Sequence, residues 1–254
     1  MELITATLTK NGLLFAFLLV GLVMWASYFL SHHLTRGRLH GSAVAIMVGL
    51  LLAYLGGLFS GGTKGLADIP LFAGLGIMGG AMLRDFAIVS TAYGVDLAEI
   101  RKSGLVGVLS LAFGIVLSFL VGAIVALAFG YGDAVSMTTI GAGAATYIVG
   151  PVTGTALGAS SEVVALSVAA GLVKSVIVMI GTPFIAPLIG LNNPKSAMAY
   201  GGLMGTTSGV AGGLAATDKR LVPYGAMTAT FYTGLGCLMG PSLMYLMIRA
   251  IFGA

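Results

Sequence analysis

Long apolar segments, joined by short connections that carry most of the charge, constrain the fold of this chain more than any other feature. Only 8% of its 254 residues are charged and 58% are hydrophobic, whereas about 25% of an average soluble domain is charged. A chain with so few charges cannot cover the surface of a water-soluble fold of this size. Because each apolar segment approaches the ~20 residues that a helix needs to cross a bilayer, we predict an all-α integral membrane protein.

The apolar segments predict about six transmembrane helices. Their expected ranges are 11–30, 42–59, 66–90, 104–129, 163–189 and 224–249. The first range could instead be a cleaved signal peptide, but its apolar run is long and the only basic residue before it is Lys10, which favours an uncleaved span. The apolar composition predicts a lipid bilayer around the chain. The sequence has no basic run interleaved with aromatic residues, so we expect no nucleic acid as a partner.

Two tracts rich in glycine, threonine and serine interrupt the apolar pattern at 136–161 and 196–217. The first contains the helix-breaking pair Gly150-Pro151, and Gly205 and Gly209 flank the hydroxyl groups of the second. A helix broken at the depth of the bilayer leaves backbone groups unpaired, which is tolerated only where the backbone is buried in protein or lines a watery cavity. We therefore predict that each tract forms a re-entrant hairpin.

The positions of the basic residues support this interpretation. If both tracts return to the side that they entered, most loop cations lie on one side, as the positive-inside rule expects of the cytoplasm. These cations are Arg36, Arg38, Arg101, Lys102, Lys195, Lys219 and Arg220, and Lys10, Lys64 and Arg249 then lie on the other side. This distribution of basic residues places the N-terminus outside the cell. If the two tracts crossed the membrane completely, Lys195, Lys219 and Arg220 would not all lie on the cytoplasmic side.

A weak internal repeat indicates two units of similar build, each made of one hairpin and one span. Residues 143–147 (GAATY) can be aligned with residues 205–209 (GTTSG). A unit that crosses the membrane once is inverted when it is repeated, so the two hairpins should enter from opposite faces. We expect residues 1–103 to be scaffold spans and residues 104–254 to be an inverted-repeat transport domain.

Hairpins that meet near the midplane would form a site for an anion and a cation. Helix N-termini offer unpaired N–H groups to an anion, and freed carbonyls and hydroxyls offer oxygen ligands to Na⁺. The candidate substrate-binding residues in the tracts are Thr146, Gly150, Thr153, Thr206, Thr207 and Ser208, and the candidate Na⁺ ligands are Thr138, Thr139, Thr155 and Gly205. The alternative for each is ordinary helix packing, with each hydroxyl bonded to its own helix.

Lys174 is the remaining candidate for substrate binding. It lies well inside a long apolar span, where a lysine costs about 2.5–3.5 kcal/mol on insertion scales. Few carboxylates lie at that depth in the sequence, so a bound anion is a natural partner for the ammonium. The alternative is a lysine that bonds to carbonyls of the tracts for structural reasons alone.

Nucleotide-binding and catalytic motifs are absent from the sequence, which argues against an enzyme. Without a nucleotide site, the energy for transport would come from an ion gradient. Proton-driven carriers usually need a titrating side chain within the membrane, and such residues are scarce here. The sequence therefore favours Na⁺ as the coupling ion and gives no indication of an organic cofactor.

The run TTIGAGAATYIVGPVTGTALG at residues 138–158, the lysine-bearing span after it and the run YGGLMGTTSGVAGGLAAT at residues 200–217 resemble the MadM subunit family of bacterial malonate transporters. The resemblance extends over the whole chain. It implies Na⁺-coupled uptake of malonate across the bacterial cytoplasmic membrane, by a complex with a smaller membrane subunit, MadL. The resemblance assigns no site residues.

A looser similarity, to LrgB-type membrane proteins, supplies the alternative functions. The order of the two tracts and spans carries it, together with the paired prolines Pro183 and Pro187. It implies a channel or exporter, or a regulatory membrane subunit, in place of a symporter. The sequence leaves open the selectivity among dicarboxylates, a higher oligomer, and the choice between an elevator-like and a rocking motion.

Overall fold

The computed structural model describes residues 2–35, 41–61, 65–78 and 97–252 of the chain. All regular elements in these ranges are helical. Five segments of these ranges are long and apolar enough to cross a membrane: Gly12–Leu34, Val44–Phe72, Gly104–Ala128, Glu162–Ile185 and Lys219–Phe252. The predicted all-helical fold is confirmed for the described residues, with five segments of membrane-spanning length and composition where the sequence predicted about six. The predicted span 66–90 lies partly outside the described residues, and its described part consists of short helices.

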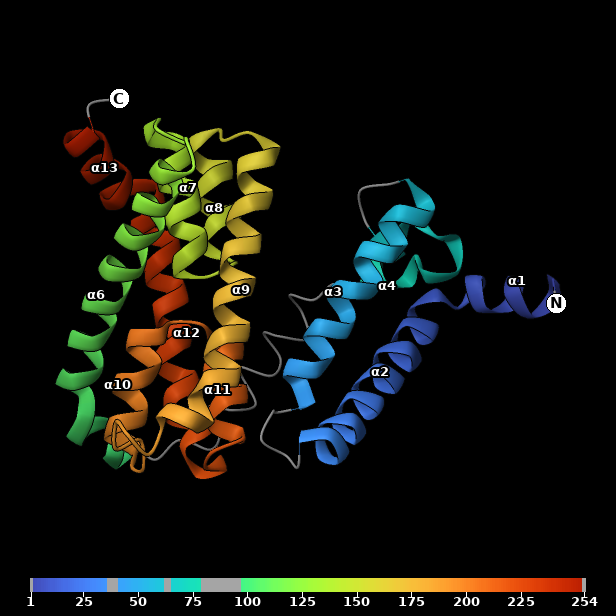
Figure 1. The fold of residues 1–254 in the computed structure, drawn as a ribbon, viewed down its shortest axis with the longest axis horizontal. Helices are drawn as coiled ribbons and strands as arrows, with labels where there is room; N and C mark the ends of the chain where they lie inside the picture. Colours follow the sequence, from blue (N-terminus) through green and yellow to red (C-terminus); the bar gives the residue numbers. More distant parts are fainter. Residues whose placement is uncertain (1, 36–40, 62–64, 79–96, 253–254) are drawn as a thin grey trace. The chain divides into compact units, whose positions relative to one another are not determined.

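The chain divides into two compact units, Met1–Ser90 and Thr91–Ala254. The first unit contains α1 (Glu2–Lys10), α2 (Gly12–Thr35), α3 (Gly41–Ser60), η1 (Gly65–Asp68), η2 (Pro70–Phe72) and α4 (Gly74–Met78). Within it, α2 packs against α3 and α4 (Figure 1). Large apolar side chains of α2 and α3, such as Leu22, Trp25 and Leu51, are exposed, as expected of helices that are hydrophobic all round and face lipid.

The second unit is built from three long helices and two pairs of short ones. The long helices are α6 (Leu97–Ala128), α9 (Ser161–Ile185) and α12 (Val222–Met239), the last preceded by η3 (Lys219–Leu221) and continued by η4 (Gly240–Met244) and α13 (Tyr245–Phe252). One short pair is α7 (Ala134–Ala145) with α8 (Val149–Leu157), and the other is α10 (Pro194–Met204) with α11 (Thr207–Ala215). The two pairs lie at opposite ends of this unit, and α6, α9 and α12 run along it (Figure 1).

Each polar tract is interrupted near its middle. In the first tract α7 ends at Ala145, and residues 146–148 separate it from α8. In the second tract α10 ends at Met204, and Gly205 and Thr206 separate it from α11. Gly205 has a φ of 70°, a left-handed conformation that glycine adopts without steric cost. Neither tract is a continuous helix, as the sequence predicted. Below, residues 146–148 are called the first break and residues 205–206 the second break.

Polar side chains fix where the short helices begin. Asp133 caps α7 by accepting a hydrogen bond of 2.8 Å from the amide of Ser136. Asn193 and Ser196 form a reciprocal capping box at the start of α10, and Thr206 caps α11. Because glycine has a weak helix propensity, these caps give glycine-rich segments defined starting points.

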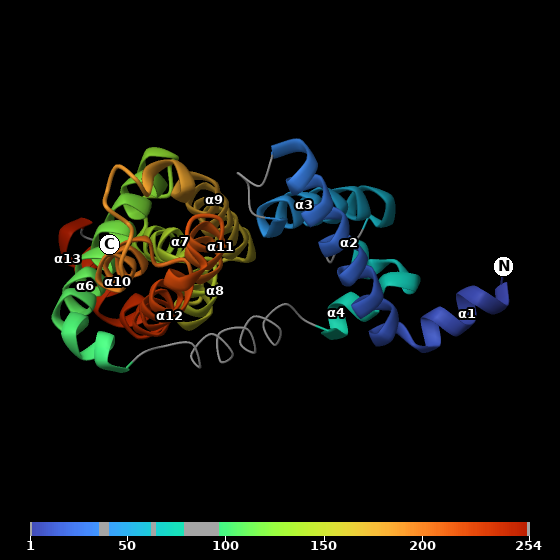
Figure 2. The same ribbon diagram turned by 90° about the horizontal axis from the view of Figure 1, so that it is seen from below.

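Glycines bring the backbones of the second unit into direct contact. A side chain at Gly171 of α9 would overlap the backbone of Tyr147 at the first break, and one at Gly209 of α11 would overlap the backbone of Ser175. Along its length α9 therefore changes partner, from the α7–α8 pair to α11. In the end-on view α7 lies between α6 and α9 (Figure 2). The change of partner on α9 occurs close to Lys174.

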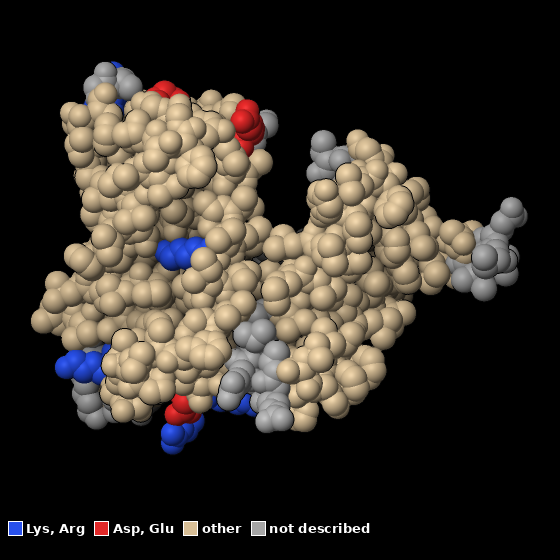
Figure 3. Space-filling model, in the orientation of Figure 1, with Lys and Arg blue, Asp and Glu red and all other residues tan. Residues whose placement is uncertain are grey.

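Charged side chains of the second unit lie mainly at its two ends. Asp133 and Glu162 belong to the end that holds α7 and α8, whereas Lys195 and the ion pair of Asp218 with Arg220 (2.8 Å) belong to the end that holds α10 and α11. Figure 3 shows charged side chains at both ends of the unit, and it also shows a basic side chain in a recess about midway between the ends. The surface between the ends is otherwise free of charge in this view, which suits contact with the hydrocarbon of a bilayer.

Candidate functional site

The ammonium of Lys174 is held inside the second unit, near the middle of α9. Nζ donates hydrogen bonds to Oγ of Ser118 in α6 at 3.0 Å and to the carbonyl of Ala145, the last residue of α7, at 2.9 Å. Nζ also lies 5.3 Å from the ring centroid of Tyr232 in α12, within the range of cation–π attraction. These partners are two neutral oxygens and an aromatic ring. Among the described residues, the charge of the lysine is stabilised by dipoles and not by a carboxylate.

The carbonyl that Lys174 contacts belongs to the C-terminal end of α7, where a helix carries partial negative charge. Backbone hydrogen bonds at the first break use the carbonyls of Ala142 and Thr146, and the lysine supplies a donor for the carbonyl of Ala145. This is the structural role that the sequence left open as an alternative. A role in binding an anion would require the ammonium to exchange these partners for the anion.

Tyr232 connects Lys174 with the second break. Its side chain is fully buried, and its hydroxyl donates a hydrogen bond of 3.1 Å to the carbonyl of Gly114 in α6. Its ring packs so closely on Gly205 that a side chain at position 205 would overlap it. One aromatic ring therefore lies against the second break and beside the ammonium that contacts the end of α7.

Ser175, the next residue after Lys174, contacts the second break. Its hydroxyl and that of Thr206 form a short hydrogen bond, and both side chains are buried. Thr206 Oγ1 also accepts a backbone hydrogen bond as the cap of α11. Thr207 and Ser208 follow in the first turn of α11 and are half-buried. The start of α11 therefore combines helix amides with three hydroxyl groups.

Thr146 and Gly150, two predicted residues of the first tract, are buried. Thr146 Oγ1 accepts a long hydrogen bond of 3.5 Å from the amide of Ile148. Gly150 packs against Ser167 of α9, and a side chain at position 150 would overlap it. The hydroxyl of Ser167 is engaged with the carbonyl of Val164. Gly150 therefore allows α8 to approach α9, and Thr146 is a buried residue that directly follows Ala145 at the first break.

Thr138 and Thr153 are fully buried, and their hydroxyls have no hydrogen-bond partner among the described residues. Thr153 Oγ1 lies against Gly240, the first residue of η4, which is a π-helical turn. Such turns are often found at functional sites, and buried hydroxyls without a partner are uncommon. Within the described part of the first tract, these two buried hydroxyls are therefore left with unused hydrogen-bonding capacity.

The other two threonines predicted as Na⁺ ligands have different surroundings. Thr139 is fully buried, but its hydroxyl donates to the carbonyl of Val135 in its own helix at 2.8 Å. Thr155 is exposed on α8. Gly205, the remaining predicted ligand, forms the turn at the second break beside Tyr232. Of the four, Thr138 alone combines burial with an unused hydroxyl in the described part of the chain.

Sequence reasoning missed three residues of this region: Ser118, Ser175 and Tyr232. Tyrosine in a membrane protein is enriched at the interfaces, so Tyr232 in the middle of a span was a signal that its hydroxyl has a partner in the interior. Ser118 is likewise an isolated hydroxyl within the long apolar run of α6. Both signals were present in the sequence, but neither identifies the partner.

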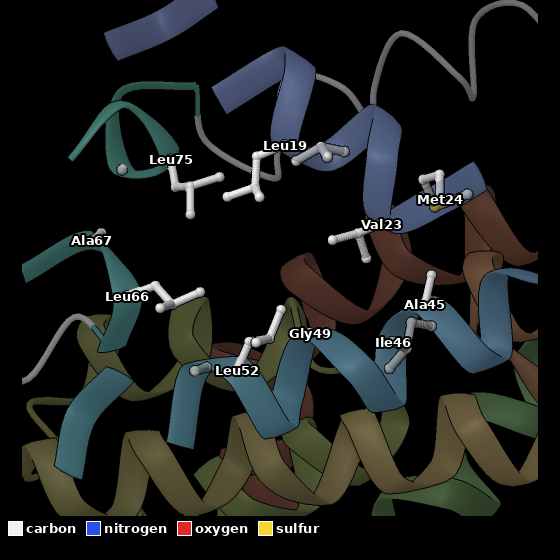
Figure 4. Close-up of a pocket in the computed structure, with 13 residues that line it drawn as sticks. Leu19, Val23, Met24, Ala45, Ile46, Gly49, Leu52, Leu66, Ala67 and Leu75 are labelled. Atoms are coloured by element: carbon white, nitrogen blue, oxygen red, sulfur yellow. The ribbon is translucent and has the colours of Figure 1, made fainter. Parts of the chain in front are cut away.

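An apolar cavity in the first unit has a different chemistry. It has a volume of about 620 Å³ and lies between α2, α3, η1 and α4 (Figure 4). Its walls are aliphatic or glycine, with Leu19, Val23, Leu52, Leu66 and Leu75 among them. Since none of the described residues that line it is charged, the cavity suits an apolar occupant and not a dicarboxylate.

Comparison with known proteins adds a family to this geometry. The sequence matches the family model described as malonate/sodium symporter MadM subunit over residues 4–252. Searches of curated proteins and of solved structures gave no match. The matched range covers nearly the whole chain and includes both breaks and Lys174, in agreement with the resemblance seen in the two tracts. The chain therefore belongs to the MadM subunit family of malonate/sodium symporters.

Proposed function

We propose that this chain is the subunit of a secondary active transporter that imports malonate together with Na⁺. Membership of the malonate/sodium symporter family supports both the substrate and the ion. The observation in the fold that carries the proposal is the ammonium of Lys174, held midway along the second unit between two broken helix pairs. A half-buried cation next to helix ends suits a small anion, because the anion would offset the cost of the charge.

In this proposal the α7–α8 and α10–α11 pairs are re-entrant hairpins of an inverted repeat, and the second unit is the transport domain. Their position at opposite ends of the unit supports this arrangement. The basic residues Lys195, Lys219 and Arg220 share one end, which would face the cytoplasm by the positive-inside rule. The chain would then lie in the bacterial cytoplasmic membrane with its N-terminus outside.

Malonate would be bound between the two breaks. One carboxylate would pair with Lys174 and accept a hydrogen bond from the hydroxyl of Thr146 at the first break. The other would accept hydrogen bonds from the amides at the start of α11 and from Thr206, Thr207 and Ser208. Short half-helices whose N-termini point at an anion supply fixed N–H donors, and the ammonium supplies a charge-assisted bond that neutral donors do not.

The coupling Na⁺ would bind to oxygen atoms of the first tract. Carbonyls at the C-terminal ends of half-helices are ligands that Na⁺ uses in broken membrane helices, and the buried, unpartnered hydroxyls of Thr138 and of Thr153, the latter predicted from the sequence as a substrate ligand, are further candidates in the same tract. The donor set therefore suits a small hard cation.

The decisive measurement is uptake of labelled malonate into liposomes that contain the purified chain, with and without MadL, the small membrane subunit that the family resemblance implies. An inward Na⁺ gradient should drive accumulation. Malonate flux that does not depend on Na⁺ would identify the alternative, an LrgB-like channel or exporter. If the chain neither transports nor binds malonate under any of these conditions, the remaining alternative is that it is a regulatory membrane subunit.

Two variants with one charge removed separate a site effect from a general one. Lys174→Gln should abolish malonate binding, whereas Lys195→Gln removes an exposed lysine at the end of the unit and should leave binding unchanged. If the two variants bind malonate with equal affinity, Lys174 does not take part in malonate binding.

Cysteine labelling tests the proposed membrane arrangement. In a Cys237→Ala background, Gly132→Cys and Ser160→Cys flank the first tract, and Asn192→Cys and Lys219→Cys flank the second. Within each pair both cysteines should react with an impermeant reagent from the same side, and the two pairs should react from opposite sides. Labelling of either pair from both sides would mean that its tract crosses the membrane.

A further inference from the structure

The ammonium of Lys174 already occupies a site built for a cation. Its partners come from three helices: the hydroxyl of Ser118, the carbonyl of Ala145 and the ring face of Tyr232. Each of them attracts positive charge of any source, through an oxygen lone pair or the negative face of an aromatic ring. None of them is specific for an ammonium ion.

The carbonyl of Ala145 is the strongest of these ligands for a metal ion. It ends α7, so the partial negative charge of the helix end adds to its own dipole. The hydroxyl of Thr146, the next residue, is buried at the same break. Carbonyls at the ends of half-helices are ligands that Na⁺ uses in broken membrane helices. The same oxygens therefore suit both an ammonium and Na⁺.

An ammonium and a Na⁺ cannot use this carbonyl together. Two positive charges at neighbouring positions in a buried site repel each other strongly, because the local dielectric is low. While Lys174 contacts Ala145, the carbonyl is engaged and the local charge is already positive. A Na⁺ would be accepted only after the ammonium has moved away.

A carboxylate of the substrate would draw the ammonium of Lys174 away from the carbonyl of Ala145. A charge-assisted hydrogen bond from an ammonium to a carboxylate is about twice as strong as one to a neutral oxygen. The lysine side chain has a flexible four-carbon stem, so the ammonium can turn to an anion without movement of α9. When it does, it loses its contact with Ala145 but keeps its proton and its charge, and the anion neutralises that charge.

We propose that the carbonyl of Ala145 is a ligand of the coupling cation, and that Lys174 fills this cation site until the dicarboxylate draws the ammonium out of it. The inference rests on the proposed function and adds the device that couples its two substrates. Malonate makes the Na⁺ site available, and by reciprocity Na⁺ raises the affinity for malonate by the same factor. Neither malonate nor Na⁺ then binds well alone, so the protein does not let Na⁺ cross without malonate or malonate cross without Na⁺.

The test is equilibrium binding of radioactive Na⁺ to the purified protein, with and without saturating malonate. In the wild type, malonate should raise the affinity for Na⁺ by roughly 5- to 150-fold, the usual range of coupling between two sites. In Lys174→Met the ammonium is gone and the side chain keeps a similar length. Na⁺ should then bind without malonate about as tightly as it binds to the wild type with malonate, and malonate should have no effect. Lys195→Met is the matched control and should behave like the wild type.

A second measurement needs no variant and so does not depend on correct folding of Lys174→Met. In the wild type the affinity for malonate should rise with Na⁺ by the same factor that malonate adds to the affinity for Na⁺. If Na⁺ leaves malonate affinity unchanged, or if Na⁺ binds equally to Lys174→Met and to the wild type without malonate, the shared site is wrong although malonate transport stands. A wild type that binds no malonate at all would instead overturn the proposed function.

Discussion

Lys174 and Ser175 are consecutive residues of α9, yet the first contacts the end of α7 at the first break and the second contacts the second break. Lys174 donates to the carbonyl of Ala145, and Ser175 shares a hydrogen bond with Thr206. Since successive side chains on a helix point in different directions, one position along α9 contacts both helix pairs. The two breaks are therefore coupled through a single turn of one helix.

The contact between Ser175 and Thr206 should stabilise the second break measurably. Thr206→Ala removes the cap of α11, which costs about 1 kcal/mol, and leaves the buried hydroxyl of Ser175 without this partner, which costs about 1–3 kcal/mol more. Thermal unfolding in detergent measures the loss. Thr228→Ala is the control, because the hydroxyl of Thr228 is also buried but bonds within its own helix, and it should destabilise less.

A double mutant sharpens this prediction. Ser175→Ala combined with Thr206→Ala should cost less than the sum of the two single changes, because the first change already removes the shared hydrogen bond. Strictly additive losses would mean that the two hydroxyls do not interact in solution.

Gly205 should not tolerate a side chain. Gly205→Ala places a Cβ in the left-handed region, at a cost of about 1–2 kcal/mol, and it also overlaps the ring of Tyr232, where overpacking costs about 1–3 kcal/mol. Gly234→Ala, at a helical position with open space around it, should be neutral or stabilising by up to about 1 kcal/mol. Similar unfolding temperatures for the two variants would contradict the geometry at the second break.

The unpartnered hydroxyls of Thr138 and Thr153 should behave differently from that of Thr139. Thr138→Val and Thr153→Val replace a buried, unsatisfied hydroxyl with a methyl group, so without ligand they should be neutral or stabilising by about 1 kcal/mol. If these hydroxyls bind Na⁺, both changes should also weaken Na⁺ binding. Thr139→Val removes a hydroxyl that bonds to Val135 and should leave Na⁺ affinity unchanged; an equal effect of all three changes on Na⁺ affinity would exclude this assignment.

The cap of α7 should make stability depend on acidic pH. Partial burial opposes ionisation of Asp133, but hydrogen bonds from Ser136 and neighbouring amides outweigh it and lower the pKa of the carboxyl below its ordinary 3.8. A lowered pKa in the folded state means that the stabilisation is fully present above about pH 4 and is lost as the pH falls through the folded value.

A matched pair of cap variants checks this dependence by thermal unfolding. Asp133→Ala should destabilise by about 1 kcal/mol at neutral pH, and its difference from the wild type should shrink at acidic pH. Asn193→Ala removes the uncharged cap of α10, so its difference from the wild type should not change over the same range. A constant effect of Asp133→Ala down to pH 3 would contradict the lowered pKa.

Much of the fold followed from the sequence, because composition and segment length determine membrane spans and clustered glycines mark breaks. The interruptions at residues 146–148 and 205–206 lie inside the predicted tracts. Lys174 contacts the first of them through Ala145, and its predicted role in substrate binding stays a proposal. The predicted re-entrance and inverted repeat stay proposals. The sequence could not predict the hydrogen-bond partners of the hydroxyl groups. A threonine or serine in a helix looks the same in the sequence whether its hydroxyl bonds to a carbonyl of its own helix or to a group on a neighbouring helix. Thr139 and Thr155 illustrate this: the first bonds to its own helix and the second is exposed.

The glycine contacts described above bear on how the molecule can move. Where Gly171 lies on Tyr147 and Gly209 on Ser175, main chain rests on main chain, with no pliable side chain between them to absorb a shift. We expect the second unit to be stiff, so that sliding one helix pair past α9 would force atoms to overlap. In the proposed transport cycle, a changeover between the two sides of a membrane would then require this unit to travel as a block, together with the malonate and Na⁺ that we propose it binds.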